Sequence, residues 1–232
     1  NYMGAISNSL RYSTHLRNLE LNGNRISSLG TDKLFKSLND NKDLAYNLRK
    51  IDLSENKIGN NNINELLTFT QDSKCNIEEL NFYGNLLGND NCVKILDNLA
   101  TFIEYRLVSL NLGLNNMNDN STNSICQVIT KCSYLRVLIL SHNWFHNASA
   151  AKIIKSLSTH YEMRVLDFSW NCIGDDLISM PTYESLVNQE IKHPEKNFDN
   201  FQLNENLSNV KFIVKSNDYE EKQKALAVYS SI

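Results

Sequence analysis

The chain of 232 residues has little proline, little glycine and almost no excess charge. Its eight Gly are scattered, and no phosphate loop, nucleophile elbow, zinc-protease helix or calcium loop occurs. A formal net charge of -3 gives no basic field of the kind that nucleic-acid binding needs, so we expect no nucleic-acid partner. No apolar run approaches the ~20 residues of a membrane span, and we expect none. We therefore predict no catalytic residues and no cofactor.

Cysteine is also sparse, and its pattern excludes a disulfide or zinc framework. The five Cys are an odd number, at positions 75, 92, 126, 132 and 172, and none forms a Cys-x-x-Cys pair. This usage fits a reduced, intracellular compartment. His142 and His146 have the spacing of metal ligands on a helix, but they stand on either side of Asn143 where a strand ends, so we expect no metal site.

One short frame occurs six times and organises the chain. It reads apolar-x-x-apolar-x-apolar-x-x-Asn-x-apolar, as in Leu48 to Ile58. The other copies are Leu16 to Ile26, Ile77 to Leu87, Leu107 to Met117, Leu135 to Phe145 and Met163 to Ile173. Alternating apolar residues predict a strand with one face inward, so each copy adds one strand to a parallel sheet.

The asparagine of the frame follows each strand, where the chain must turn inside the stack. Buried backbone groups there need partners, and an Asn side chain offers one acceptor and two donors. We predict a structural ladder of six such residues: Asn24, Asn56, Asn85, Asn115, Asn143 and Asn171.

The residues after each asparagine settle the type of repeat. Seven, ten, eleven and fourteen positions on stand mostly apolar residues, such as Cys92, Ile95, Leu96 and Leu99, which is the period of an amphipathic helix. A repeat of about 28 residues that pairs a strand with a full helix resembles the ribonuclease-inhibitor type of leucine-rich repeat. The resemblance implies an α/β fold: a right-handed, curved solenoid with parallel strands on the concave face and helices on the convex face.

The ends of the chain depart from the repeat. Helix positions of an earlier repeat would fall on Met3, Ile6, Ser7 and Leu10, so we expect residues 1–15 to end a preceding repeat within a longer chain. Residues 16–174 form six repeats, with a loop insertion at Asn39 to Asp43. Pro181 breaks the register, and we expect residues 175–232 to form an irregular cap. This cap would hold a helix near 183–192, a terminal strand within 207–214 and a helix near 219–228.

The outward side chains of the predicted strands divide the concave wall into an acidic and an apolar part. The predicted partner-binding residues are Leu114, Val137, Ile139, Val165, Trp170, Trp144, Asp52, Glu79 and Tyr83. A row of exposed apolar residues often marks an interface, and Trp is enriched among residues that dominate binding. The alternative is that residues 175–232 fold back and cover the apolar part.

We therefore predict a non-enzymatic scaffold that holds a protein partner on its concave face within a larger assembly. One alternative is a GTPase-activating protein of the leucine-rich repeat type, for which Arg25, Arg49 and Arg136 are the candidates. Others are the sensor array of a nucleotide-binding immune receptor or a ribonuclease inhibitor. High usage of Asn, Ile and Lys resembles a protist with an AT-rich genome, where such repeats are common in ciliary and cytoskeletal assemblies. We expect a cytoplasmic location.

Overall fold

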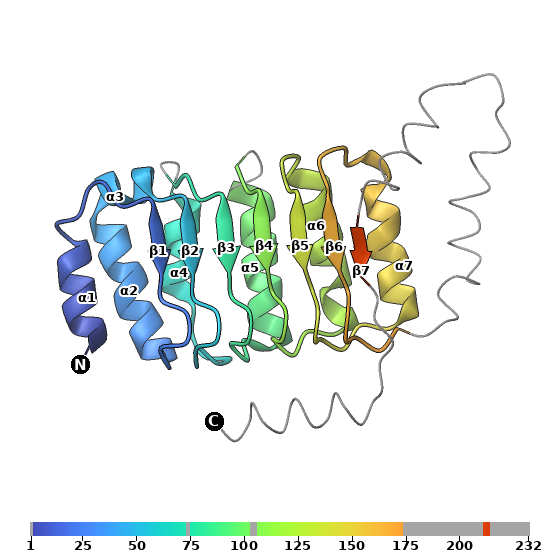
Figure 1. The fold of residues 1–232 in the computed structure, drawn as a ribbon, viewed down its shortest axis with the longest axis horizontal. Helices are drawn as coiled ribbons and strands as arrows, with labels where there is room; N and C mark the ends of the chain where they lie inside the picture. Colours follow the sequence, from blue (N-terminus) through green and yellow to red (C-terminus); the bar gives the residue numbers. More distant parts are fainter. Residues whose placement is uncertain (1, 73–74, 103–105, 174–210, 214–232) are drawn as a thin grey trace, which may run out of the picture.

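The computed structural model describes residues 2–72, 75–102, 106–173 and 211–213. Its strands form one parallel sheet in chain order, and the helices lie on one side of that sheet (Figure 1). The strands are β1 (Asn18–Glu20), β2 (Lys50–Asp52), β3 (Glu79–Asn81), β4 (Ser109–Asn111), β5 (Val137–Ile139), β6 (Val165–Asp167) and β7 (Lys211–Ile213). The helices are α1 (Tyr2–Leu10), α2 (Ser28–Asp40), α3 (Lys42–Asn47), α4 (Asn64–Gln71), α5 (Gly88–Phe102), α6 (Thr122–Lys131) and α7 (Asn147–Ser156), with single turns η1 (Asp119–Ser121) and η2 (Leu157–Thr159). This confirms the predicted α/β solenoid.

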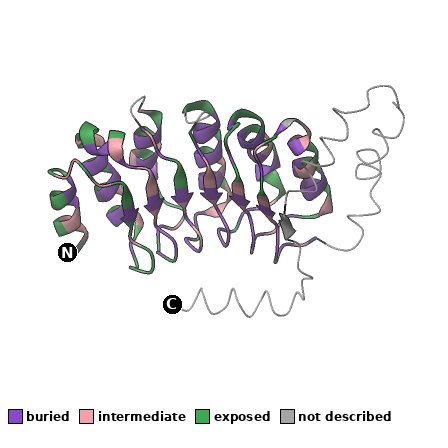
Figure 2. Cartoon of the chain, turned by 45° about the horizontal axis from the view of Figure 1, so that its top comes forward, coloured by how far each residue is buried: buried purple, intermediate pink, exposed green. Residues whose placement is uncertain are grey.

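Each of the strands β1 to β6 buries its central residue and turns the two flanking residues to the side without helices, which we call the open face. The central residues pair in register from strand to strand: Leu19, Ile51, Leu80, Leu110, Leu138 and Leu166. Helix residues such as Phe35 and Leu99 close the core from the other side and are fully buried. In Figure 2 the buried residues follow the strands and the inner sides of the helices. One continuous apolar core therefore runs through the coils.

The segment predicted as a loop insertion at Asn39 to Asp43 is helical instead. Helix α2 runs to Asp40, and α3 begins two residues later. Asn41 makes this possible, because its Oδ1 accepts from the Leu44 N–H (3.1 Å) as a helix N-cap. Its Nδ2 also donates to the carbonyl oxygens of Leu10 (2.8 Å) and Ser13 (2.7 Å). The polar residues thus join two coils rather than forming an exposed loop.

Buried asparagines join the turns that follow the strands. Asn115 Nδ2 donates to the Phe82 carbonyl of the preceding coil (2.8 Å) and to the Gly113 carbonyl of its own turn (3.0 Å). Its Oδ1 accepts from the backbone N–H groups of Asn85 and Leu87, each at 3.2 Å. Asn56, Asn85, Asn143 and Asn171 are likewise buried and donate to the coil before them.

Asn24 differs from this expectation. It is exposed, and its Nδ2 donates only to the Asn22 carbonyl in its own turn (3.0 Å). The physical reason is that β1 is the first strand of the described sheet, so no described turn precedes it as an acceptor.

The residue before each of these six asparagines adopts the left-handed backbone conformation. The φ angles lie between 52° and 68° at Gly23, Glu55, Gly84, Leu114, His142 and Trp170. Because this region disfavours a Cβ atom by roughly 1–2 kcal/mol, the four non-glycine residues are held there by the bonds of the adjacent asparagine. The turn geometry is therefore set by the ladder, not by glycine.

Helix α1 and strand β7 lie in the two terminal segments for which the sequence analysis made predictions. Helix α1 covers most of the stretch in which we expected the end of a preceding repeat. Strand β7 lies within residues 207–214 and pairs in parallel with β6. The helices expected near 183–192 and 219–228 lie outside the described residues.

A cross-coil cap starts α7. His146, the N-cap residue, gives no side-chain cap of its own, and Asp119 of the preceding coil bonds to the backbone N–H and ring of His146 instead. Asp119 Oδ1 accepts from the His146 N–H (3.0 Å) and Oδ2 contacts the His146 ring (2.8 Å). Burial by itself would raise the pKa of Asp119, but these hydrogen bonds and one from Ser149 outweigh it and lower the pKa below its ordinary value.

We expect Asn115→Ala to lower the free energy of unfolding by about 2–4 kcal/mol, because buried backbone donors and acceptors in two turns lose their partner. The matched control is Asn24→Ala, which removes the same amide from an exposed site and should change stability by less than about 0.5 kcal/mol. Urea denaturation followed by circular dichroism measures both. Equal losses would show that burial of the ladder does not matter.

Substitution of Asp119 by Ala should destabilise the protein at pH 7 by about 1 kcal/mol, the usual effect of losing a helix cap. The pKa of Asp119 is lowered in the fold, so its stabilisation is present above the unfolded pKa of about 3.9 and is lost as the pH falls further. Thermal melts from pH 7 to pH 3 should therefore show the two proteins converging at the acid end. A constant gap across this range would contradict the assignment.

Candidate functional site

The open face changes from polar to apolar along the solenoid. Strands β1 to β4 present pairs such as Lys50 and Asp52, or Ser109 and Asn111, whereas β5 presents Val137 and Ile139, both half-buried. A hollow of about 280 Å³ lies where the two parts meet. The lining side chains come from β2 to β5 and include Lys50, Asp52, Glu79, Asn81, Ser109, Asn111, Val137 and Ile139.

The polar part carries an excess of carboxylates. Lys50 Nζ pairs with Glu20 (2.7 Å). The hydrogen bond to Glu20 raises the pKa of Lys50, with smaller contributions from the charges of Glu79 and Asp52 and an opposing one from burial. One lysine thus stands among three carboxylates, and this end of the face is negative.

Asp52 also has a structural role that the sequence reasoning missed. Its Oδ1 accepts from the Ser54 N–H (2.9 Å), and its Oδ2 accepts from Asn81 Nδ2 (2.9 Å). The same side-chain bond to the N–H two residues on occurs at Asn81, Asn111 and Asp167. These turns end the strands. The signal was the recurrence of Asn or Asp at this position in four of the six strands, and Glu20 and Ile139 are the two exceptions.

The predicted apolar row needs one correction. Leu114 is only 2% exposed. Its left-handed backbone turns the side chain toward the preceding coil, where Cδ2 lies 3.6 Å from the place that a Cβ on Gly84 would occupy. Val165 remains half-buried on the open face beside Val137. Trp144 lies in the turn after Asn143, where its backbone N–H donates to the Met117 carbonyl (2.9 Å).

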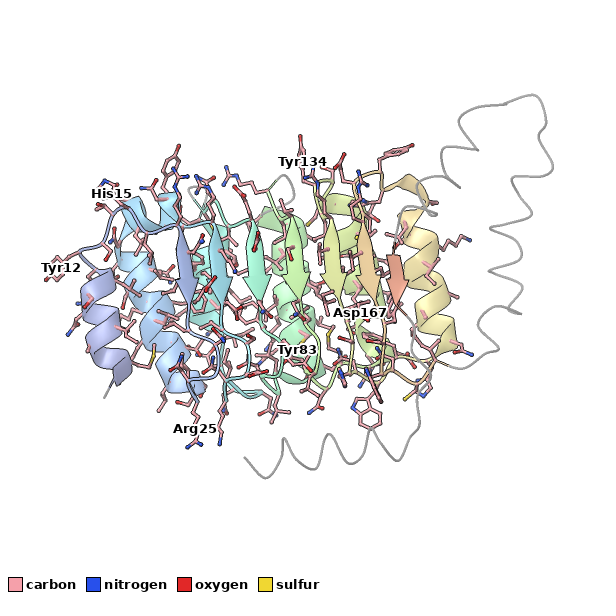
Figure 3. All side chains as sticks on the ribbon, viewed as in Figure 1. Tyr12, His15, Arg25, Tyr83, Tyr134 and Asp167 are labelled. Carbon is pink, nitrogen blue, oxygen red and sulfur yellow. The ribbon has the colours of Figure 1, made fainter. Side chains whose placement is uncertain are left out.

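Three rings form a row along the edge at which the strands end, which we call the exit rim. The rings of His142 and Trp170 stack with centroids 5.4 Å apart and an interplanar angle of 9°. Tyr83 meets the same imidazole edge-on at 6.2 Å. Gly113 gives the Tyr83 ring its space, since a Cβ there would lie 2.8 Å from Tyr83 Cδ2. Figure 3 labels Tyr83 below the sheet. The row brings together two predicted residues, Tyr83 and Trp170, through a histidine that was not predicted.

The candidate arginines do not share a site. Arg25 lies on the exit rim, as Figure 3 shows, whereas Arg49 and Arg136 line a hollow with Tyr134 at the opposite edge of the sheet. No single surface therefore presents all three.

In the described part of the chain, no three His, Cys, Asp or Glu side chains gather closely enough to hold a metal ion. His142 and His146 point to different partners, the Trp170 ring and Asp119. Among the same residues, no helix has the length and apolar character to cross a membrane.

Repeating coils of strand, asparagine-bonded turn and helix define a leucine-rich repeat solenoid. A family model described as "Leucine Rich repeat" matches residues 12–35, 131–153 and 163–176. The chain thus contains leucine-rich repeats. No curated protein matches the sequence.

Several solved structures resemble this chain. An internalin from Listeria monocytogenes is 18% identical with a TM-score of 0.47, and the match covers 90% of this chain and 50% of the internalin chain. A plant peptide hormone receptor in complex with RGF2 is 18% identical with a TM-score of 0.40, covering 70% of this chain and 26% of its own. A leucine-rich repeat protein from Leptospira interrogans is 15% identical with a TM-score of 0.39, covering 88% and 50%. This chain therefore spans 50% of the internalin, 50% of the Leptospira protein and 26% of the plant receptor.

We expect Gly113→Ala to push the Tyr83 ring away from His142 and to destabilise the fold by about 1–3 kcal/mol, as overpacking does. Denaturation measures the loss, and the chemical shifts of the His142 ring protons report the departure of Tyr83. In a Tyr83→Ala background the same substitution should be much less harmful. An equal loss in both backgrounds would trace the effect to Ser141, whose carbonyl lies 3.1 Å from the new Cβ.

Proposed function

We propose that the protein is a non-enzymatic scaffold whose open face holds another protein. The observation that carries this proposal is the half-buried apolar group Val137, Ile139 and Val165 at open-face positions of the adjacent strands β5 and β6. Open-face positions of β1 to β4 are polar or charged, so a partner that covers these three residues removes an apolar surface from water.

The carboxylates beside the apolar group define the chemistry of that partner. Asp52 and Glu79 line the same hollow as Val137 and Ile139. A basic side chain next to an apolar one would match both parts, and opposite charges chiefly set orientation and association rate. The proposed partner is therefore a protein segment with an apolar anchor and flanking Lys or Arg.

Finer assignments belong to the same proposal. A full helix in most coils and steps of 28 to 32 residues between ladder asparagines support the ribonuclease-inhibitor-like subclass. We further propose a cytoplasmic setting in a cytoskeletal or ciliary assembly, supported by composition and by the odd number of cysteines. The opposite placement of Arg25 and Arg49 gives no support to a GTPase-activating role.

The double substitution Val137→Ser with Ile139→Asn tests the open face. It converts the wall of the fifth coil into a copy of the fourth, which carries Ser109 and Asn111, and the new Asn can make the strand-ending turn that Ile139 lacks. We expect stability to change by less than about 1 kcal/mol and partner affinity to fall about tenfold or more, since two apolar contacts are lost. Quantitative affinity capture from cell extract, followed by titration of the captured partner, measures the change.

The matched control places two substitutions on the helix side, Lys36→Gln with Lys94→Gln. Both lysines are exposed, on α2 and α5. This control should bind the partner like the unaltered protein. If it loses the partner while the open-face variant retains it, the binding surface is the helical side and the proposal is wrong.

A further inference from the structure

Arginine is concentrated on one edge of this solenoid. The loops that lead into the strands form the entry rim, made of residues 11–17, 46–49, 75–78, 106–108, 133–136 and 160–164. Six of the seven arginines of the chain lie there: Arg11, Arg17, Arg49, Arg106, Arg136 and Arg164. Among the described residues of these loops, the carboxylates are Glu78 and Glu162, and Asp40 of α2 is paired to Arg11 at 3.5 Å. A chain of net charge -3 therefore carries one basic edge.

Exposed tyrosines share this edge. Among the described residues, the exposed tyrosines are Tyr12, Tyr46, Tyr134 and Tyr161, each between 52% and 87% accessible, and all four lie on the entry rim. Figure 3 shows Tyr134 and His15 at the top of the sheet, opposite Arg25. Tyr and Arg are, together with Trp, the residues most enriched among those that dominate the binding energy of protein interfaces.

The rim contains a hollow of about 320 Å³ between the second and fifth coils. Arg49, Arg106 and Arg136 line it with Tyr134, and Glu78 is the one carboxylate. Glu78 pairs with Arg49 Nε at 3.3 Å. Arg136 also pairs with Glu162 of the next coil, whose carboxylate accepts from Nε (3.1 Å) and Nη2 (3.0 Å). Three guanidinium groups thus surround a space that holds a single negative charge.

Hydrogen bonds that hold the entry loops in shape explain only part of the enrichment of arginine on the entry rim. Arg49 and Arg164 each donate Nη1 to the carbonyls three residues and one residue before them, which holds the loop in shape. Arg17 makes no side-chain bond to any described residue and is exposed. Arg136 donates its side-chain hydrogen bonds to the Glu162 carboxylate of the neighbouring coil rather than to its own loop.

We propose that the entry rim binds an acidic segment of a partner protein, with its carboxylates on the guanidinium groups around this hollow and its apolar side chains against Tyr134. The planar arginine fork matches a carboxylate in two parallel hydrogen bonds. The carboxylates interspersed along the rim, Glu78 and Glu162, would repel the unbroken phosphate chain of a nucleic acid, whereas a peptide can place uncharged residues opposite them. This surface is separate from the open face and does not depend on its function.

The test titrates the full chain with a fluorescein-labelled peptide in which Glu alternates with Phe and Ser, and follows fluorescence anisotropy at low and physiological ionic strength. We expect Arg136→Gln to weaken binding about fivefold, the loss of one charge-assisted contact, and the double variant with Arg49→Gln to weaken it further. Arg17→Gln, which breaks no bond of the fold, should weaken binding about twofold. Arg25→Gln on the exit rim is the matched control and should bind like the unaltered protein.

Two comparisons make the outcome decisive. A peptide with Gln in place of Glu should not bind, and a single-stranded oligothymidylate should compete less well than the acidic peptide. The proposal is overturned if Arg25→Gln weakens binding as much as Arg136→Gln, if the Gln peptide binds equally, or if the oligothymidylate competes better, which would identify a nucleic-acid surface. The open-face variant Val137→Ser with Ile139→Asn should leave this titration unchanged, so the open-face proposal and the entry-rim proposal are tested independently of each other.

Discussion

Each buried asparagine amide ties its own turn to the turn of the coil before it. The bonds of Asn115 reach Phe82 and Asn85 behind it and Gly113 beside it, so one side chain satisfies backbone groups of two coils. The strands lead into these turns at fixed positions, and the left-handed residue before each asparagine is held at an angle that Leu114 or His142 would otherwise avoid. Register of the sheet, burial of the core and direction of the exit-rim side chains all follow from this one set of bonds.

The architecture was readable in the sequence because its signal is repeated. Six frames in one register fix the buried strand residues, and the helical period fixes the opposite wall of the core. Single positions were harder. Leu114 looked exposed because strand alternation was extended one residue too far, into a turn where the backbone reverses the side chain. Residues 39–43 looked like a loop because their polar side chains bond to other coils, which no local pattern reveals.

The surfaces show the same division between periodic and local information. The open-face columns could be read from the strand period, but the bonds that occupy Asp52 could not. Four of the rim arginines, Arg17, Arg49, Arg136 and Arg164, stand at one position of the repeat, directly after its first apolar residue, so this column was readable in the sequence but lay outside the strand positions. Only Arg11 and Arg106 stand at other positions, and Arg106 joins Arg49 and Arg136 in space. An acidic and apolar wall and a basic, tyrosine-rich edge thus share one rigid framework, and a partner could engage them from different directions.

The asparagine ladder has a consequence for how such a molecule changes in size. The Oδ1 of each inner asparagine accepts from the coil behind it, and its backbone N–H donates to the Oδ1 of the asparagine ahead, as Asn85, Asn115 and Asn143 show in succession. Each Nδ2 donates to a carbonyl of the coil behind. A duplicated coil would therefore find matching neighbours on both sides, and a deleted one would leave no gap in the bonding. Each such event would lengthen or shorten the sheet by one strand spacing of about 4.8 Å, so the reach of the protein is adjustable in whole steps without a new fold.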